Sequence, residues 1–399
     1  MSTMTTIGSG RRTEQRERGF TLIELLVAMA ITTVILGATM AAMNDAVMAT
    51  DSAKQVTDLN AGLRTATDLV VRDLLQVGQG LPTGRVVGLP NGAGTTAMML
   101  PGPIGSEYQY EGFSFCPPDP NDATPDTFCE QISAVVPGPS RGPEIGDGVF
   151  SDLITIVAAD CAFERVRLTN FASNGRTVTV NPAVNITNGG PNDVEPGVLL
   201  MLSKGLNSLL VQVTAVNGQV LSFAAGDSLN LNQSSTTYGL QWLRAQAPPD
   251  TNPVAPATFV ATEATRIRLI SYYLDVVTDP ARPRLVRRMN NGHPTEFDNS
   301  RGTVVAFDVE NFQITYDLAD VVIPGAAPVP ITNVRMDDDD LGGTGACAPR
   351  ACSPNQIRKV NLTLSGRSRR PLRRTGEFLH NALVTQVSLR SLAFVDEYR

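Results

Sequence analysis

The sequence predicts an α+β protein in which one long N-terminal helix precedes an antiparallel, β-rich globular head. Three observations support this prediction. A proline-free stretch with apolar residues at helical spacing runs from Phe20 to Val77. Beyond residue 150, short alternating segments follow one another with turn residues between them, as strands do. These segments show no strand–helix–strand rhythm, so we expect the sheet to be antiparallel.

The first part of this helix is predicted to cross a membrane. From Phe20 to Met43 nearly every residue is apolar or small, which matches the ~20 residues that a helix needs to span a hydrocarbon core. The basic residues lie on the N-terminal side, which places the leader in the cytoplasm and the C-terminal bulk outside. Glu24 is the single ionisable residue of the stretch. A carboxylate inside a span is costly and normally has a partner, although a simple anchor with Glu24 near the headgroups is the alternative.

The second part of the helix is amphipathic. Gly78, Gly80 and Pro82 are expected to end it, and an unbroken helix up to that point would be on the order of 85 Å long. Its apolar residues recur at spacings of three and four, the pattern of one buried stripe. They are Val56, Leu59, Leu63, Ala66, Val70, Leu74 and Val77.

The segment GFTLIELLVAMAITTV, behind a short basic leader, resembles the type III prepilin signal of type IV pilins and type II secretion pseudopilins. The resemblance implies cleavage between Gly19 and Phe20 by a prepilin peptidase, followed by methylation of the Phe20 amine. It also implies that Glu24 pairs with the N-terminal amine of a neighbouring subunit during assembly. The cut precedes the apolar segment, so the segment stays in the mature chain, unlike an ordinary secretory signal.

The resemblance also gives the expected architecture, a type IV pilin-like helix whose first half is transmembrane and whose amphipathic second half packs on the head. The expected organisation is a leader over residues 1–19, a transmembrane or filament-core helix over 20–43, the second half of that helix over 44–78, a Gly/Pro-rich loop region over 79–150, a β-rich subdomain over 151–245, a linker over 246–264 and a C-terminal antiparallel β subdomain over 265–399.

Several strand features of the head are specific enough to test. Asn217-Gly218 predicts a hairpin with a type I′ turn, since both residues tolerate positive φ. A long strand is expected over 266–277, with 284–288 as its hairpin partner. The alternation of apolar residues changes parity near residues 310–311, which predicts a bulge. A last strand is expected over 383–394.

The five cysteines all lie beyond the apolar segment, on the side where disulfides are permitted. We expect Cys347 to pair with Cys352 across a short loop, and Cys116 with Cys129 as the next candidate pair, which leaves Cys161 free. Four cysteines allow three connectivities, so the pairing stays open, as does the alternative that some are buried thiols.

Few residues suggest catalysis or metal binding. His293 and His380 lie in no nucleophile or metal motif, and we expect no enzyme activity and no required cofactor. Asp337, Asp338, Asp339 and Asp340 are a calcium candidate because calcium takes carboxylate and backbone oxygens. The spacing does not fit an EF-hand loop, and the alternative is a solvated acidic loop.

A basic stretch spans a strand end and the hairpin tip between the last two expected strands. DNA capture or docking to an acidic neighbour are possible functions, and a solvated turn that suppresses edge-to-edge aggregation is the favoured interpretation. Binding of nucleic acid is not expected, because no aromatic residues interleave the arginines and the chain has a net charge of −7. The stretch contains Arg358, Lys359, Arg367, Arg369, Arg370, Arg373 and Arg374.

The C-terminal segments SYYLDVV, FDVENFQITYDL, IRKVNLTLSGRS and LVTQVSLRSLAF resemble those of PilW-like minor pilins, in that order. The resemblance implies a structural subunit of a type IV pilus, in a tip or priming complex. Its partners would be other minor pilins, the major pilin, the prepilin peptidase, the pilus assembly platform and an adhesin at the tip. The location would be the inner membrane, with the head outside the cytoplasm, and then the surface pilus. The alternatives are a GspJ-like type II secretion pseudopilin and a pilus-borne adhesin or DNA-binding subunit.

Overall fold

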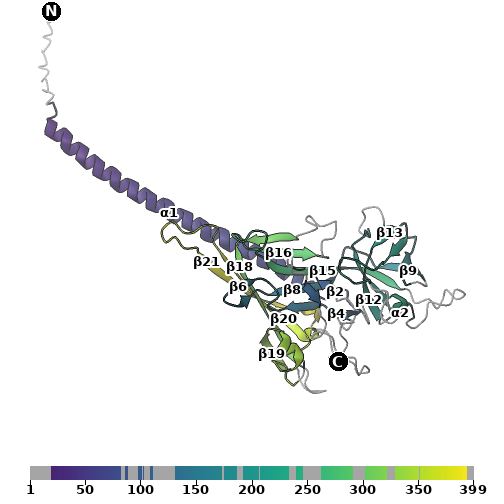
Figure 1. Ribbon diagram of the computed structural model, residues 1–399. Helices are drawn as coiled ribbons and strands as arrows, with labels where there is room; N and C mark the ends of the chain where they lie inside the picture. Colours follow the sequence, from purple (N-terminus) through teal and green to yellow (C-terminus); the bar gives the residue numbers. More distant parts are fainter. Residues whose placement is uncertain are drawn as a thin grey trace, which may run out of the picture. The chain divides into compact units, whose positions relative to one another are not determined.

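The computed structural model describes most of the chain, and Figure 1 shows its elements. The described residues are 19–81, 86–88, 98–100, 102, 108–110, 131–172, 175–186, 192–205, 207–232, 240–245, 262–290, 302–320, 329–349 and 351–392. They form two compact units. The helix unit comprises Met1–Lys54 with Leu372–Gly376, and the head unit comprises Gln55–Pro371 with Glu377–Arg399.

The long helix α1 spans Leu22–Leu74, 53 residues. Turn residues follow it, and both Gly78 (φ 71°) and Gly80 (φ 70°) adopt the left-handed backbone that stops a helix. The helix therefore ends three residues before Val77, which the sequence pattern included. The remaining helices are short: α2 Leu240–Ala245, α3 Asp338–Gly342, and the 3₁₀ turns η2 Pro354–Gln356 and η3 Arg390–Leu392.

The larger sheet of the head unit has 13 described strands, in the order β13-β14-β10-β9-β15-β11-β12-β1-β4. Of the others, β8 and β16 pair with β15, β5 pairs with β8, and β17 pairs with β16. The strands are β1 Val86–Gly88, β4 Gln131–Ser133, β5 Val135–Gly138, β8 Leu153–Ala159, β9 Val166–Phe171, β10 Thr177–Val180, β11 Leu199–Lys204, β12 Asn207–Gln212, β13 Ala215–Asn217, β14 Val220–Ser222, β15 Glu263–Asp275, β16 Arg284–Met289 and β17 Thr303–Phe307.

The smaller sheet has the order β19-β18-β20-β21. Its strands are β18 Val309–Asp320, β19 Val329–Val334, β20 Ile357–Arg367 and β21 His380–Ser388. Two further ribbons pair β2 Met98–Leu100 with β3 Tyr108–Tyr110, and β6 Glu144–Gly146 with β7 Val149–Phe150. Short strands therefore occupy parts of 79–150, the region expected to be loops. The larger sheet joins strands from 151–245 and 265–399, so it crosses the boundary expected between these subdomains.

Two strand predictions are confirmed with changes of detail. The hairpin at Asn217-Gly218 is present, but Asn217 pairs with Val220 and so belongs to the strand. Gly218 (φ 57°) is then the first turn residue and alone has positive φ, so the type I′ prediction is wrong. The bulge appears as a register shift between Val309 and Asn311.

Two other details of the sheets differ from the sequence expectation. β1 pairs with β12 in parallel, through Gly88 and Leu209, whereas the other described pairs are antiparallel. β21 ends at Ser388 and a 3₁₀ turn follows, so the last strand is shorter at its end than the sequence suggested. The pairing of β15 with β16 is confirmed, from Ile270 with Met289 to Asp275 with Arg284.

The apolar stripe of α1 forms part of the main core of the head unit. Leu63 is 2% exposed and packs in one hydrophobic cluster with Phe312 of β18 and Leu364 of β20. Gly366 makes this close approach possible, since a Cβ there would lie 3.3 Å from Leu63 Cδ2 and 2.7 Å from the Asp308 carbonyl oxygen. The stripe begins one turn later than expected, because Val56 is 39% exposed.

Candidate functional site

The segment expected to be processed lies just before the first turn of α1. Gly19 and Phe20 are both exposed, and Phe20 exposes 87% of its surface. A Cβ built on Gly19 would meet no atom within 4 Å. The described fold therefore does not need a glycine at this position. A requirement for glycine here would have to come from an enzyme that binds the segment, as a cleavage site implies.

Glu24 caps the helix that contains it. Its Oε2 accepts a hydrogen bond from the Thr21 backbone N–H (2.9 Å) and one from the Thr21 hydroxyl (3.0 Å). The Glu24 N–H in turn lies 3.4 Å from Thr21 Oγ1. This reciprocal arrangement is a capping box, and it places a carboxylate where the positive end of the helix dipole stabilises it. The carboxylate is therefore held in place by the first turn of its own helix.

Thr21 was not among the expected site residues, yet it holds the carboxylate on which the assembly prediction depends. The sequence did contain a signal for it. Thr21 and Glu24 have the spacing of a capping box and stand just before an apolar helical run. The family resemblance drew attention to Glu24 alone, whereas the geometry makes Thr21 its positioning residue.

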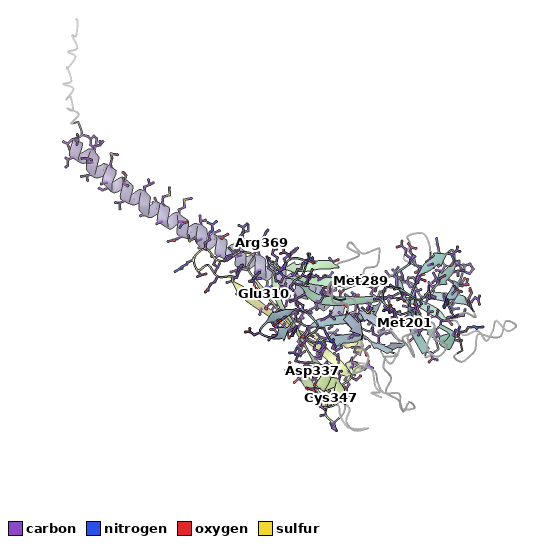
Figure 2. All side chains as sticks on the ribbon, viewed as in Figure 1. Met201, Met289, Glu310, Asp337, Cys347 and Arg369 are labelled. Carbon is purple, nitrogen blue, oxygen red and sulfur yellow. A yellow bond between two sulfur atoms is a disulfide. The ribbon has the colours of Figure 1, made fainter. Side chains whose placement is uncertain are left out.

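The rest of the first part of α1 is apolar and exposed on all sides (Figure 2). It is long and apolar enough to cross a membrane. Its threonine hydroxyls need no outside partner, because Thr32, Thr33 and Thr39 each bond a backbone carbonyl of the preceding turn. Polar groups satisfied within the helix add little cost in lipid, so Glu24 is the distinctive polar group of this segment.

A buried hydrogen-bonded cluster attaches the end of α1 to the larger sheet, within the head unit. Asp73 is 6% exposed, and its Oδ2 accepts from the Tyr272 hydroxyl (2.5 Å) and from Arg287 Nε (2.7 Å). Burial, followed by the nearby Asp73 charge, raises the pKa of Tyr272 well above its ordinary value. Tyr272 therefore stays protonated and keeps donating to Asp73. Such a charged cluster holds the end of the helix in one rotation and one axial position, and it also stabilises the packing of the helix on the sheet.

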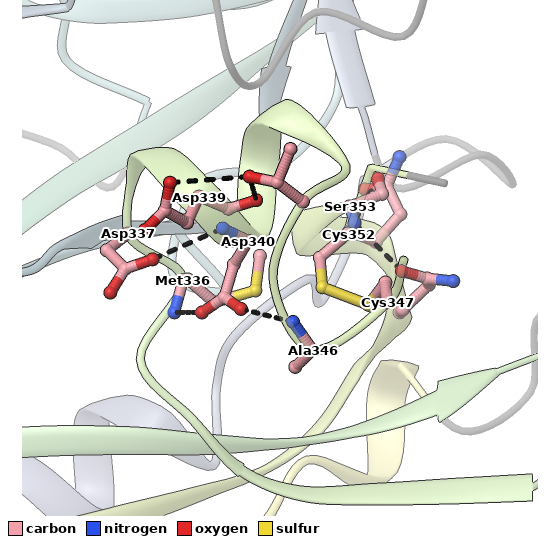
Figure 3. The surroundings of a disulfide bond; sticks show 11 residues. Met336, Asp337, Asp339, Asp340, Ala346, Cys347, Cys352 and Ser353 are labelled. Carbon is pink, nitrogen blue, oxygen red and sulfur yellow. Dashed lines mark hydrogen bonds between the residues drawn. A yellow bond between two sulfur atoms is a disulfide. The ribbon is translucent and has the colours of Figure 1, made fainter. Parts of the chain in front are cut away.

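Two of the four acidic residues expected as calcium ligands, Asp337 and Asp340, accept hydrogen bonds from backbone N–H groups around α3 (Figure 3). Asp337 is the N-cap residue and accepts from the Asp340 N–H (3.2 Å). Asp340 is buried and accepts from the N–H groups of Met336 (2.9 Å) and Ala346 (2.8 Å). Asp338 and Asp339 lie in the first turn of α3, where the helix dipole favours acids. Within the described residues, no group of three or more His, Cys, Asp or Glu is placed to hold a metal ion.

The same loop holds the disulfide between Cys347 and Cys352, whose Cα atoms are 5.3 Å apart. The Cys352 N–H donates to the Asp340 carbonyl (2.8 Å). This hydrogen bond connects the disulfide to the capped turn of α3. Cys161 is an exposed free thiol. Cys116 and Cys129 lie outside the described residues, so their expected pairing stays a prediction.

Of the two histidines, the structure describes His380, which is exposed. His380 Nδ1 lies 2.9 Å from Glu310 Oε2 at the start of β21, as in an ordinary surface pair. His293 lies outside the described residues.

The basic stretch divides into engaged and exposed residues. Lys359 lies 3.8 Å from Asp317, Arg367 pairs with Glu310 at 3.2 Å, and Arg358 donates to backbone carbonyls. These side chains help to hold the smaller sheet together. The remaining members of the stretch are exposed and make no ion pair with a described residue: Arg369, Arg370, Arg373 and Arg374.

Comparison with known proteins bears on the N-terminal segment. Residues 15–40 match the prokaryotic N-terminal methylation motif. No curated protein and no solved structure matched the chain. The motif supports a type IV pilin-like protein, a subunit of the pilin or pseudopilin type that is processed as a prepilin. The long apolar helix followed by a strand-rich globular region is consistent with a pilin-like α+β fold and fits a membrane-anchored, pilus-associated protein.

Proposed function

We propose that this protein is a PilW-like minor pilin that helps to prime assembly of a type IV pilus. The main observation behind the proposal is the prepilin-type motif at residues 15–40, which includes the start of α1, where the helix is apolar and exposed and Glu24 is the one carboxylate. The head adds support, because more than 300 residues follow the helix, which is large for the compact major pilins and suits a subunit present in few copies. The order of the PilW-like segments in β15, β18, β20 and β21 points the same way.

In the proposed mechanism, cleavage frees the amine of Phe20 and methylation modifies it. Glu24 lies one helical turn beyond this terminus, so a small axial shift between two subunits brings the amine of one to the carboxylate of the next. Oε2 is occupied by Thr21, and no described residue donates to Oε1, so Oε1 is open to the incoming amine. In a medium of low dielectric constant this attraction is several times stronger than in water.

The head would then select neighbours. With other minor pilins it would form a complex at or beneath the pilus tip, and the major pilin would be added below it by the assembly platform. An adhesin at the tip is a further partner under this proposal, whereas binding of nucleic acid is not part of it.

Processing is tested first. N-terminal sequencing of the protein from cells is expected to begin at a methylated Phe20. Replacing Gly19 with a bulky residue is expected to leave the leader attached, which an immunoblot shows as a larger band. Since nothing surrounds the Gly19 Cβ position, the variant is expected to fold normally. A mature N-terminus elsewhere, or a mature-size band from the variant, would contradict the assignment.

A GspJ-like pseudopilin would share the processing signal, so a second experiment separates the two functions. Deletion of the gene is expected to abolish surface pili while export of type II secretion substrates continues, and complementation restores the pili. The opposite pattern would identify a pseudopilin. Co-purification from membranes followed by mass spectrometry would then name the partner subunits.

A further inference from the structure

The loop between β20 and β21 contains a segment that belongs to the helix unit. Leu372–Gly376 groups with Met1–Lys54 rather than with the head. The segment is a closed turn, because the Gly376 N–H donates to the Leu372 carbonyl at 2.8 Å. Arg373 and Arg374 at its tip are exposed and make no ion pair with a described residue.

The exposure of the residues along α1 shows which part of the helix lies beside residues 372–376. Every residue of 21–47 is exposed, so no described segment covers that part of the helix. Met48, Asp51 and Ser52 are the first residues of α1 to be partly buried, and their spacing puts them on one helix face. Within the helix unit, the turn 372–376 therefore lies beside the helix at residues 48–54.

This level is close to the expected membrane surface. Met48 is about 8 Å beyond Met43 along the axis at ~1.5 Å per residue, and Met43 ends the apolar stretch. The headgroup layer adds roughly 5–8 Å outside each face of the hydrocarbon core. The two guanidinium groups therefore lie within about one Debye length, ~10 Å at 0.1 M salt, of lipid phosphates.

We propose that Arg373 and Arg374 form a second membrane contact, which binds the headgroups of anionic phospholipids on the outer side of the membrane that α1 spans. The proposal rests on the membrane anchoring of α1. Guanidinium groups bind phosphates with paired, charge-assisted hydrogen bonds. Arg369 and Arg370 add to the charge of the same loop, whereas Asp45 and Asp51 on the helix oppose it. Glu377 is the one acid of the loop between β20 and β21 and directly follows the turn, so the loop carries four arginines against one carboxylate.

The contact would act before assembly. A subunit waiting in the membrane would be held by its helix and by this turn. Extraction into a filament would break the arginine–phosphate bonds, and neutral lipids or high salt would weaken them. The expected effect of each arginine is about fivefold in the contact equilibrium.

The test uses the full-length chain in lipid nanodiscs of phosphatidylcholine alone or with phosphatidylglycerol. Hydrogen–deuterium exchange is measured for peptides that cover residues 368–379. We expect exchange of residues 372–376 to be several-fold slower with phosphatidylglycerol, and the difference to vanish in 0.5 M salt. The variant Arg373→Glu/Arg374→Glu should lose the protection. The matched control Arg167→Glu/Arg390→Glu, with the same change of charge at two exposed head residues, should keep it.

Equal exchange in the two lipids, or protection that survives Arg373→Glu/Arg374→Glu, would overturn the proposal. Protection by added duplex DNA or by an acidic partner protein, without any effect of phosphatidylglycerol, would also overturn it. The comparison of lipids needs only the unmodified chain, so a folding defect in the variant does not affect it. Slow exchange of residues 20–43 in both lipids reports the anchoring of α1 separately, which distinguishes a failure of the anchor from a failure of the loop contact.

Discussion

The cluster that attaches α1 to the head offers the sharpest test of how the helix is held. Tyr272→Phe removes one hydrogen bond to a charged group, and because Tyr272 is fully buried the ring keeps its packing. Such a bond contributes about 1.5–3 kcal/mol. Asp73→Asn removes the carboxylate that faces Arg287, whose side chain is only 16% exposed. Breaking a buried pair of this kind costs about 3–5 kcal/mol, and the partial exposure of Arg287 favours the lower end.

The two substitutions should not add. Both hydrogen bonds are accepted by the same atom, Asp73 Oδ2. In a chain that already carries Asp73→Asn, Tyr272→Phe therefore removes a weaker hydrogen bond and costs less stability. We expect a coupling of about 1–2 kcal/mol in a double-mutant cycle. The assay is denaturant unfolding of the detergent-solubilised chain, together with hydrogen exchange of residues 59–74. Each substitution should lower the free energy of unfolding and should also speed the hydrogen exchange of residues 59–74.

A matched control is available on the same helix. Asp68 is exposed, and Asp68→Asn is expected to change the free energy of unfolding by less than about 0.5 kcal/mol. Equal losses from Asp73→Asn and Asp68→Asn would show that the buried cluster does not stabilise the attachment of α1. Additive effects of Tyr272→Phe and Asp73→Asn, within about 0.5 kcal/mol, would show that the two hydrogen bonds are not coupled.

Three further predictions concern assembly, pH and packing. Glu24→Ala should insert into the membrane normally but reduce filament assembly and co-purification of partner pilins by at least about tenfold, because the attraction for the incoming amine is lost. Burial raises the pKa of Asp160, but an amide hydrogen bond and two guanidinium groups outweigh it and lower the pKa overall. The stabilisation from Asp160 is therefore complete above its unfolded pKa of ~3.9 and is lost as the pH falls through the lower folded pKa. The difference in unfolding free energy between the natural chain and Asp160→Asn should accordingly be large at pH 7 and should shrink as the pH falls below the unfolded pKa of ~3.9. Gly366→Ala should destabilise the head by about 1–3 kcal/mol, since its Cβ would contact backbone, whereas Gly62→Ala in open space should stabilise by about 0.5–1 kcal/mol.

Each of these three predictions has a result that would contradict it. For Glu24→Ala, the control is Thr39→Val, because the Thr39 hydroxyl bonds a carbonyl of its own helix. Equal filament assembly by the two variants would contradict the role of Glu24. For Asp160, a difference in unfolding free energy that stays constant from pH 7 to pH 3 would show that its ionisation does not matter. For Gly366, equal stability of the alanine variant and the natural chain in denaturant unfolding would mean that the core has room there.

Much of the helix could be predicted from sequence because its signals are local. Apolar residues at spacings of three and four mark a buried face wherever they pack, and all of the expected stripe is buried except Val56. The pairing of β15 with β16 could be predicted for the same reason, because these two strands follow one another in the chain. The Thr21–Glu24 capping box could also have been found, since it needs only four consecutive residues.

Other features required the tertiary structure. The Asp337–Asp340 run was expected to offer cation ligands, and only the fold shows that Asp337 caps α3 and that Asp340 accepts a hydrogen bond from the Ala346 N–H. The basic stretch looked uniform, yet Glu310 and Asp317 of β18 pair with part of it from more than 40 positions away in the chain.

The sequence alone determined that this chain has a processing signal, an apolar helix with one acid, and a β-rich head, because composition and local periodicity fix such properties. The tertiary structure alone decided which charged residues are paired and which are exposed. It placed Asp73 against Tyr272 and Arg287, and it placed residues 372–376 with the helix. These contacts join residues about 200 or more positions apart in the chain, and no local pattern records which distant segments meet.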